Sequence, residues 1–285
     1  MRQEQISWVF VCQSGKLERE ACVLAASLRR HLDERAKLIA AVPQPEQLVG
    51  KLDPSVVDFL TSLDVKLQTF TNPMLTDGNQ TLRLLMNKAY TLTLDEDSDV
   101  NVFMDSDQIC LAPVDPRDFV IPFLARRAMF IGTVGMHGKW QMAYDLCGAA
   151  IPQQQVIHFS ERIPGAFVVT PPSFNSDFIA VHQNWAHVLQ GEYVECFKRL
   201  EEHDLLGAAR YFTEQIAFGI AVSKILIPYG IDEHRIDRCF FHYYTKQRLA
   251  KFKNRAAMVR QLCHQYPQLC KILDLGEEWE PVLGE

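Results

Sequence analysis

The sequence has no long hydrophobic run and no cluster of basic residues. Its first residues, MRQEQISWVF, contain one arginine and an apolar run too short for a signal peptide or a bilayer span. We therefore expect a cytoplasmic protein without a transmembrane segment. The 29 Lys and Arg are scattered among 35 Asp and Glu, and the formal net charge is −6. Because no basic stripe is formed, we expect no nucleic-acid partner.

Several sequence motifs of common protein classes are also missing. The eight cysteines form no C-x-x-C pair and mostly lie in apolar periodic segments, which predicts reduced, buried thiols. No G-x-G-x-x-G, G-x-S-x-G or H-E-x-x-H motif occurs, so dinucleotide oxidoreductases, serine hydrolases and zinc proteases have no support. Repeats and low-complexity linkers are absent too. With 48% hydrophobic residues, the chain is expected to form one globular domain, with at most an appendage.

The first part of the chain alternates between strand and helix patterns. Apolar runs predict strands at 6–12, 37–42, 65–70 and 100–104, and helical spacing predicts helices at 18–32, 55–63 and about 82–89. This alternation predicts an α/β fold of Rossmann-like type, with a mainly parallel sheet flanked by helices. Site residues are then expected just beyond the carboxyl ends of the strands.

The rest of the chain is less regular. A helix is expected at 139–147, strands at 167–170, 177–182 and 240–244, and helices at 185–200 and 208–224. A basic amphipathic helix at 245–264 leads into an acidic tail. We predict that residues 1–244 form the domain and that residues 245–285 form a C-terminal helical appendage docked on it.

Three D-x-D triplets occur, and their positions differ. The two that share residues 95–99 lie in a polar turn, where short acidic side chains usually cap the backbone. Asp105 and Asp107 instead directly follow the apolar strand that ends at Met104. Two carboxylates placed there can bind one Mn²⁺ or Mg²⁺, which completes its shell with substrate phosphates. The alternative is a solvated acidic loop after a strand.

The stretch from Asn87-Lys88-Ala89 to Met104-Asp105-Ser106-Asp107 resembles the donor site of GT-A glycosyltransferases, most closely glycosyltransferase family 8 and its relatives. In those families a helix with an N-K element precedes an apolar strand that ends in D-x-D. The resemblance implies a GT-A type fold and metal-dependent transfer of a sugar from a nucleotide diphosphate sugar, expected to be a UDP-sugar, to a hydroxyl acceptor. Asn87, Lys88 and Ser106 would contact the donor. An exposed helical Lys88 without a ligand is the alternative.

The resemblance extends to the sugar site. Phe174-Asn175-Ser176-Asp177 stands where the family has an F-N-x-G element, so Asn175 would contact the donor. Asp177 replaces the usual Gly, which leaves the identity of the donor sugar open. An Asx turn that opens a strand is the alternative interpretation.

Three later positions also match the family pattern. Glu214 and Gln215 resemble an acidic-Gln pair near the acceptor or the reacting carbon, and His242 resembles the third metal ligand. Lys246 would contact a phosphate, although the Gly, Pro and Trp of the family's G-x-x-K-P-W element are missing. The resemblance leans to retention of configuration, whereas inversion would need Asp177 or Glu214 as a base. An exposed helical pair and a core histidine are the alternatives.

Cys12, Gln13 and Ser14 follow the first strand, where the resembling enzymes hold the base and ribose of the nucleotide. The simpler alternative is a strand-to-helix turn in which Ser14 caps the helix. Two other functions stay open at this point. A sugar nucleotidyltransferase shares the alternating pattern and metal dependence, and a non-catalytic nucleotide-sugar binding protein would keep the site without the reaction.

Overall fold

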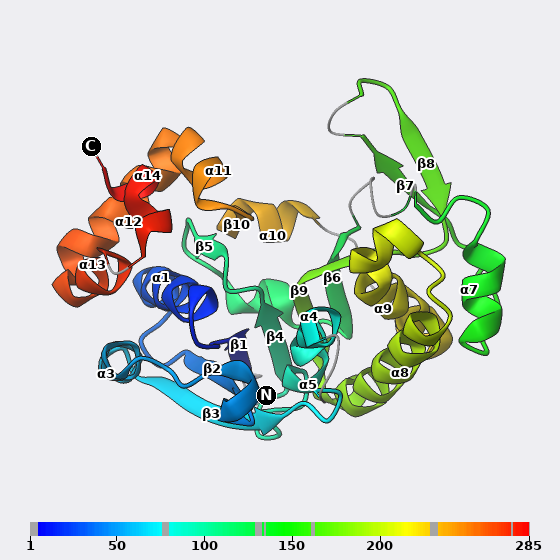
Figure 1. Ribbon diagram of the computed structural model, residues 1–285, viewed down its shortest axis with the longest axis horizontal. Coiled ribbons are helices and arrows are strands. Elements are labelled where there is room, and N and C mark those ends of the chain that lie inside the picture. The colour runs from blue at the N-terminus through cyan, green and yellow to red at the C-terminus, as the bar shows by residue number, and fades with distance from the viewer. Residues whose placement is uncertain are drawn as a thin grey trace.

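The computed structural model describes residues 5–75, 80–128, 133, 135–160, 163–228, 233–274 and 276–284. Its centre is a six-stranded sheet with the order β3-β2-β1-β4-β9-β6 (Figure 1). The strands are β1 (Ile6–Val11), β2 (Lys37–Gln44), β3 (Val65–Thr71), β4 (Val100–Met104), β6 (Phe123–Arg127) and β9 (Phe174–His182). β1 to β4 pair in parallel, while β9 is antiparallel to β4 and β6. The predicted α/β fold with a mainly parallel sheet is confirmed, and the architecture is consistent with a GT-A-like Rossmann fold.

The two faces of the sheet bury different hydrophobic clusters. In β4, Val102 and Met104 join one cluster and Phe103 joins the other, because successive side chains of a strand point to opposite faces. Both faces are covered, which explains why β4 is apolar without a polar alternation. Its one polar side chain, Asn101, donates hydrogen bonds to the carbonyl oxygens of Leu92 and Asp95.

Helices cover the two faces from separate parts of the chain. α1 (Lys16–His31) and α3 (Pro54–Ser62) lie on one face, and α5 (Asn87–Thr91), α8 (Gln183–Glu202) and α9 (Thr213–Lys224) lie on the other (Figure 1). The predicted helix at 82–89 is two short helices, α4 (Gln80–Leu84) and α5. Two further short elements are α2 (Glu46–Val49), between β2 and α3, and a 3-10 turn, Gly207–Phe212, before α9.

The C-terminal segment packs beside α1 and α3 (Figure 1). It comprises α11 (Lys246–Lys251), α12 (Lys253–Gln265), α13 (Pro267–Asp274), a 3-10 turn (Glu277–Trp279) and α14 (Glu280–Leu283). The single helix predicted at 245–264 is interrupted at Phe252, whose ψ of 81° is not helical and whose ring packs on Phe241 at 5.1 Å. Leu262 and Leu273 share the hydrophobic cluster of α1. The predicted division of the chain into a domain, residues 1–244, and a docked appendage, residues 245–285, stays a prediction.

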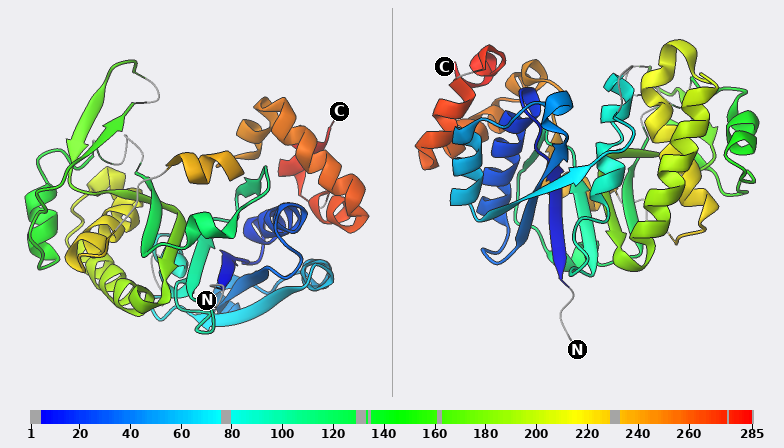
Figure 2. Two further views of the ribbon diagram at one scale, coloured as in Figure 1. Left: turned by 180° about the vertical axis from the view of Figure 1, so that it is seen from behind. Right: turned by 60° about the horizontal axis from the view of Figure 1, so that its bottom comes forward.

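The rest of the chain contains two further predicted strands and several elements that the sequence did not indicate. β5 (Gln108–Cys110) pairs with β10 (Phe240–His242), and a 3-10 turn (Pro116–Phe119) precedes β6. β7 (Val156–Phe159) and β8 (Phe167–Thr170) form a separate antiparallel pair that projects from the body (Figures 1 and 2). The strands β8 and β10 and the helix α7 (Trp140–Leu146) were expected, whereas β5, β6, β7 and α10 (Glu233–Cys239), which precedes β10, were not.

All eight cysteines are free and seven of them are buried, which confirms the expectation of reduced, mostly buried thiols. Among the described residues, no helix has both the length and the apolar character needed to cross a membrane.

Two glycines give a matched test of how α9 packs on the sheet. A Cβ at Gly219 would lie 2.8 Å from the carbonyl oxygen of Pro172, just before β9, whereas a Cβ at the exposed Gly191 of α8 would meet nothing within 4 Å. Gly219→Ala is expected to lower the free energy of unfolding by about 1–3 kcal/mol through overpacking. Gly191→Ala is expected to raise it by about 0.5–1 kcal/mol, since alanine favours helix. Urea denaturation measures both, and equal effects would contradict this packing.

Candidate functional site

Polar and charged residues, several of them singled out from the sequence, gather at one edge of the sheet. Asp105 follows β4, Gln13 follows β1, and Arg126 lies at the end of β6. These strands run in the same direction, so their carboxyl ends share an edge. β9 runs the opposite way and therefore brings its beginning, with Asp177, to the same place. The edge holds both acidic and basic side chains.

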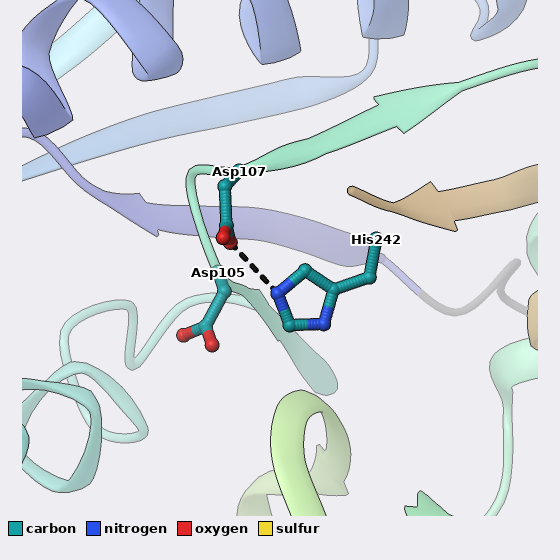
Figure 3. Close-up of side chains that lie close together, drawn as sticks. All are labelled: Asp105, Asp107 and His242. Atoms are coloured by element: carbon teal, nitrogen blue, oxygen red, sulfur yellow. Dashed lines mark ion pairs between the residues drawn. The ribbon is translucent and has the colours of Figure 1, made fainter. Parts of the chain in front are cut away.

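Asp105, Asp107 and His242 form a cluster suited to a metal ion (Figure 3). One ligand atom from each side chain lies within 4.8 Å of the others. His242 Nε2 is 2.9 Å from Asp107 Oδ1. The β5–β10 pairing sets this geometry, since it places His242 opposite Gln108, the residue next to Asp107.

The chemistry of this cluster fits Mn²⁺ or Mg²⁺. Two carboxylates and one imidazole suit Mn²⁺, and carboxylates with phosphate oxygens suit Mg²⁺. The side chains of Asp105 and Asp107 are 26% and 17% exposed, so the cluster has an open side for a substrate. Nearby, Asp177 Oδ1, Glu214 Oε1 and Gln215 Oε1 are buried without a hydrogen-bond partner in the described chain.

Asp177 orients His242 from the side opposite Asp107. His242 Nδ1 donates to Asp177 Oδ2 at 2.6 Å, which leaves Nε2 facing the cluster. Arg126 Nη1 binds the same Asp177 oxygen at 2.7 Å. Burial opposes ionisation of Asp177, but Arg126 and His242 outweigh it and lower the pKa of Asp177 to about 2. Burial likewise opposes the charge on His242, but Asp177 and Asp107 raise its pKa to about 10.

Lys88 connects the cluster to Glu214. Its Nζ lies 3.2 Å from Asp105 Oδ1 and 3.9 Å from Glu214 Oε2, and it donates to Ser176 Oγ at 3.1 Å. Ser176 Oγ in turn donates to Glu214 Oε2 at 2.8 Å. Burial raises the pKa of Glu214 to about 7, against the opposing effects of Lys88 and Ser176. Lys88 is 9% exposed, so it is not the solvated helical lysine of the alternative interpretation.

The loop after β1 contacts the helix that carries Lys88. Asn87 Nδ2 donates to Gln13 Oε1 at 3.3 Å, and Asn72 Nδ2 donates to Asn87 Oδ1 at 2.9 Å. The half-buried side chain of Ser14 does not cap α1: Gly15 is the N-cap residue, and its N–H donates to Glu18 Oε1 at 2.8 Å. The capping alternative for Ser14 is therefore wrong.

Cys12 and Ser106 were predicted to contact the nucleotide-sugar donor, but both side chains are buried within the protein. Cys12 is fully buried, and burial raises the pKa of its thiol far above the usual range. The Ser106 hydroxyl donates to the carbonyl oxygen of Val11, which fixes the turn that carries the two aspartates against the end of β1. Both side chains shape the site instead of presenting a polar group to it.

Asn175, predicted to contact the donor, and Gln215, predicted to lie near the acceptor or the reacting carbon, lie side by side. Gln215 Nε2 donates to Asn175 Oδ1 at 3.3 Å, and the backbone N–H of Asp177 donates to the same oxygen at 3.3 Å. The second bond is the Asx-type contact of the alternative interpretation, so Asn175 shapes the strand start as well as facing the site.

Lys246 does not have the position expected of a phosphate-binding residue. It is 2% exposed, pairs with the fully buried Glu20 and lies 5.1 Å from the centre of the Trp279 ring. The ammonium group of Lys246 therefore forms an ion pair that joins α11 to α1. Lys246 is no longer a candidate for contact with the donor phosphates. The match of Lys246 to the family motif rested on sequence position alone. The burial of Lys246 and its pairing with Glu20 depend on α1, which is far away in the chain.

The sequence analysis missed Arg126 and Ser176. Arg126 ends a strand of sequence FLARR, and a strand recognised there would have pointed to the edge shared with Asp105. Ser176 lies inside the segment noted for Asn175 and Asp177, but its bonds to Lys88 and Glu214 come from three separate elements. No local signal identifies such a contact.

The acidic turn at 95–99 is structural, as expected. Asp95 pairs with Lys37 and accepts from Ser98, and Asp99 Oδ2 accepts from the backbone N–H of Gln5 at 2.8 Å. The carboxylates of Asp95 and Asp99 therefore bind groups of the turn, of β2 and of the backbone just before β1.

The family model described as a Rhodobacterales glycosyltransferase domain matches residues 8–225 of this chain. This range begins inside β1, continues through β9 and includes the D-x-D turn and Glu214. No curated protein matches this chain.

Proposed function

The chain belongs to the Rhodobacterales glycosyltransferase domain family, and from that premise we propose that it transfers a sugar from a UDP-sugar to a hydroxyl acceptor with the help of Mn²⁺ or Mg²⁺. The protein is a glycosyltransferase enzyme, and the donor, the metal and the stereochemistry are the proposed parts. The observation that carries the proposal is the Asp105, Asp107 and His242 cluster beside the buried Lys88.

Each residue of the cluster has a proposed role. Asp105, Asp107 and His242 would hold the divalent cation, whose chemistry is to neutralise the diphosphate and stabilise it as a leaving group. Lys88 adds a second positive charge near the same phosphates. Asn87 and Gln13, bonded to each other beside Lys88, offer amide groups to the nucleotide. Asp177 is a positioning residue, since it fixes the His242 ring.

In the reaction, the bond between the anomeric carbon and the diphosphate oxygen breaks, and a bond to the acceptor oxygen forms. The proton of the acceptor hydroxyl leaves to a base. We propose retention, in line with the resemblance to glycosyltransferase family 8, with the departing diphosphate oxygen taking the proton and with Glu214 and Gln215 facing the sugar. Inversion would require a carboxylate base instead, and Glu214 is then the candidate, because Asp177 is held by Arg126 and His242.

Glu214→Gln tests the role of the carboxylate. The amide keeps the size of the side chain and can still bind Ser176, but it removes the charge. Turnover is expected to fall about a hundredfold or more, the usual contribution of a charged group at the reacting centre, while UDP affinity stays within about threefold. Steady-state release of UDP and the anomer of the product by NMR provide the measurements. Unchanged turnover in both Glu214→Gln and Asp177→Asn would end this account of the mechanism.

The function itself is tested by thermal unfolding with UDP, with and without Mn²⁺. A ligand that binds the folded state raises the apparent stability, by about 2.7 kcal/mol at a hundred times its Kd. We expect UDP to stabilise the protein with Mn²⁺ and much less without it. UDP release from a panel of UDP-sugars then identifies the donor. The absence of any shift with all nucleotides would overturn the proposal.

A further inference from the structure

A second charged pocket lies on the other side of His242. Its volume is about 450 Å³, within the usual range of ligand sites. β6, β7, β9 and the C-terminal elements from α10 to α12 contribute its lining. Four guanidinium groups line it, those of Arg126, Arg127, Arg248 and Arg255, against two carboxylates, those of Asp177 and Asp237. The pocket is therefore positively charged as a whole.

The two carboxylates are already paired with one of the arginines. Arg126 binds Asp177 at 2.7 Å and Asp237 at 3.0 Å. Arg248 and Arg255 make no ion pair with a carboxylate within the described ranges, although both line the pocket. Burial and the like charge of Arg248 lower the pKa of Arg255, with Asp237 opposing. Two cations held close together, neither of them in an ion pair with a described carboxylate, favour the binding of an anion.

Aromatic rings hold these two guanidinium groups in place. Arg255 lies 3.6 Å from the centre of the Phe241 ring, and Arg248 lies 4.6 Å from that of Tyr244. Stacking on a ring uses the flat face of a guanidinium and leaves its N–H edge free for a bidentate oxyanion. Tyr244 also lies 3.7 Å from His242 between ring centres, so one ring contacts both Arg248 and the candidate metal cluster.

The pocket overlaps only in part with the residues proposed to hold the donor and the metal ion. Gln13, Asn87 and Lys88 do not line it, and neither do Asp105 and Asp107. The two regions share His242, Asp177 and Asn175 as a common wall. An acceptor bound in this pocket would approach the sugar from the side opposite the nucleotide.

On the basis of the proposed function, we propose that this pocket binds the acceptor and that the acceptor is anionic, with a phosphate or carboxylate group held by Arg248 and Arg255. The acceptor hydroxyl would then lie toward Asn175 and His242. Phosphate and carboxylate share the chemistry that the two guanidinium groups recognise.

The test uses the full chain saturated with UDP and Mn²⁺, titrated calorimetrically with glucose 6-phosphate, glucuronate and uncharged glucose. The wild type is expected to bind one or both anions at least about tenfold more tightly than glucose, since charge-assisted hydrogen bonds are the strong ones. R248Q/R255Q is expected to lose that preference and to keep its UDP affinity. The matched control R30Q/R35Q removes two charges from exposed arginines around the end of α1 and is expected to keep the preference.

The single variants R248Q and R255Q are measured alongside and are each expected to weaken anion binding at least threefold. A wild type that binds neither anion better than glucose would overturn the proposal. So would anions that compete with UDP, together with loss of UDP affinity in R248Q/R255Q, because the pocket would then hold the donor diphosphate. A third result would separate the two proposals. If UDP does not bind but the anions still bind in a way that depends on Arg248 and Arg255, the proposed function is refuted and the anion-binding pocket is supported.

Discussion

Asp105→Asn and Asp107→Asn are each expected to lower metal-dependent turnover at least about a hundredfold, since even the outer partners of metal ligands cost 10–100-fold. Each substitution replaces one of the two carboxylates proposed to bind the metal by a neutral amide of the same size. The UDP-induced thermal shift with Mn²⁺ is expected to disappear, while the small shift without Mn²⁺ remains. Steady-state UDP release at several Mn²⁺ concentrations gives the measurement.

The chain supplies its own control for this experiment. Asp97 belongs to two other D-x-D triplets, but it is exposed in the turn before β4. Asp97→Asn makes the same chemical change and is expected to leave turnover and the Mn²⁺ dependence unaltered. Equal losses of turnover in Asp97→Asn and Asp105→Asn would mean that turnover depends on the total negative charge of the protein and not on the cluster. Full turnover in both Asp105→Asn and Asp107→Asn would refute the metal site.

Arg126→Met is expected to lower the free energy of unfolding by about 3–5 kcal/mol, the usual effect of removing one partner of a buried ion pair. Asp177 is fully buried, and Arg126 is its closest permanent cation. Without Arg126, the carboxylate keeps only His242, whose charge depends on its proton. Urea denaturation monitored by circular dichroism measures the loss, which should leave the slope of the transition unchanged.

An exposed ion pair provides the comparison. Arg117 binds Asp115 at 2.6 Å at the surface, where solvent screens the interaction. Arg117→Met is expected to leave the midpoint of the transition where it is. A midpoint for Arg126→Met that also does not move would contradict the idea that Asp177 depends on a buried partner.

The substitution of Arg126 is also expected to affect Mn²⁺ binding, independently of its effect on stability. Mild destabilisation alone leaves turnover intact below the transition, whereas a displaced Asp177 would free the ring of His242. We therefore expect Arg126→Met to weaken Mn²⁺ affinity about 10–100-fold at temperatures where the variant is fully folded, as measured by titration of UDP release with Mn²⁺.

The amino-acid sequence by itself determined the order of strands β1 to β4 and of the longer helices α1 and α3, and it indicated the edge at which the candidate site lies. Strand and helix periodicity are local properties, so the strand that ends at Met104 and the acidic pair after it were readable without any tertiary contact. The same applies to the structural role of the acidic turn at 95–99. Where periodicity is weak, as around β5 to β7, the sequence predicted no strands.

Only the tertiary structure decided what the isolated polar residues do. His242 lies beside Asp107 because β10 pairs with β5, and Asp177 is paired with an arginine 51 residues away in the sequence. Lys246 pairs with Glu20. Arg248 and Arg255, which form no ion pair with a carboxylate in the described part of the chain, come together because α11 and α12 pack near β10. Burial and charge pairing depend on residues distant in the chain. The D-x-D motif could therefore mark the candidate site from the sequence alone, whereas the partners of the two aspartates and the arginine-lined pocket became visible only in the folded structure.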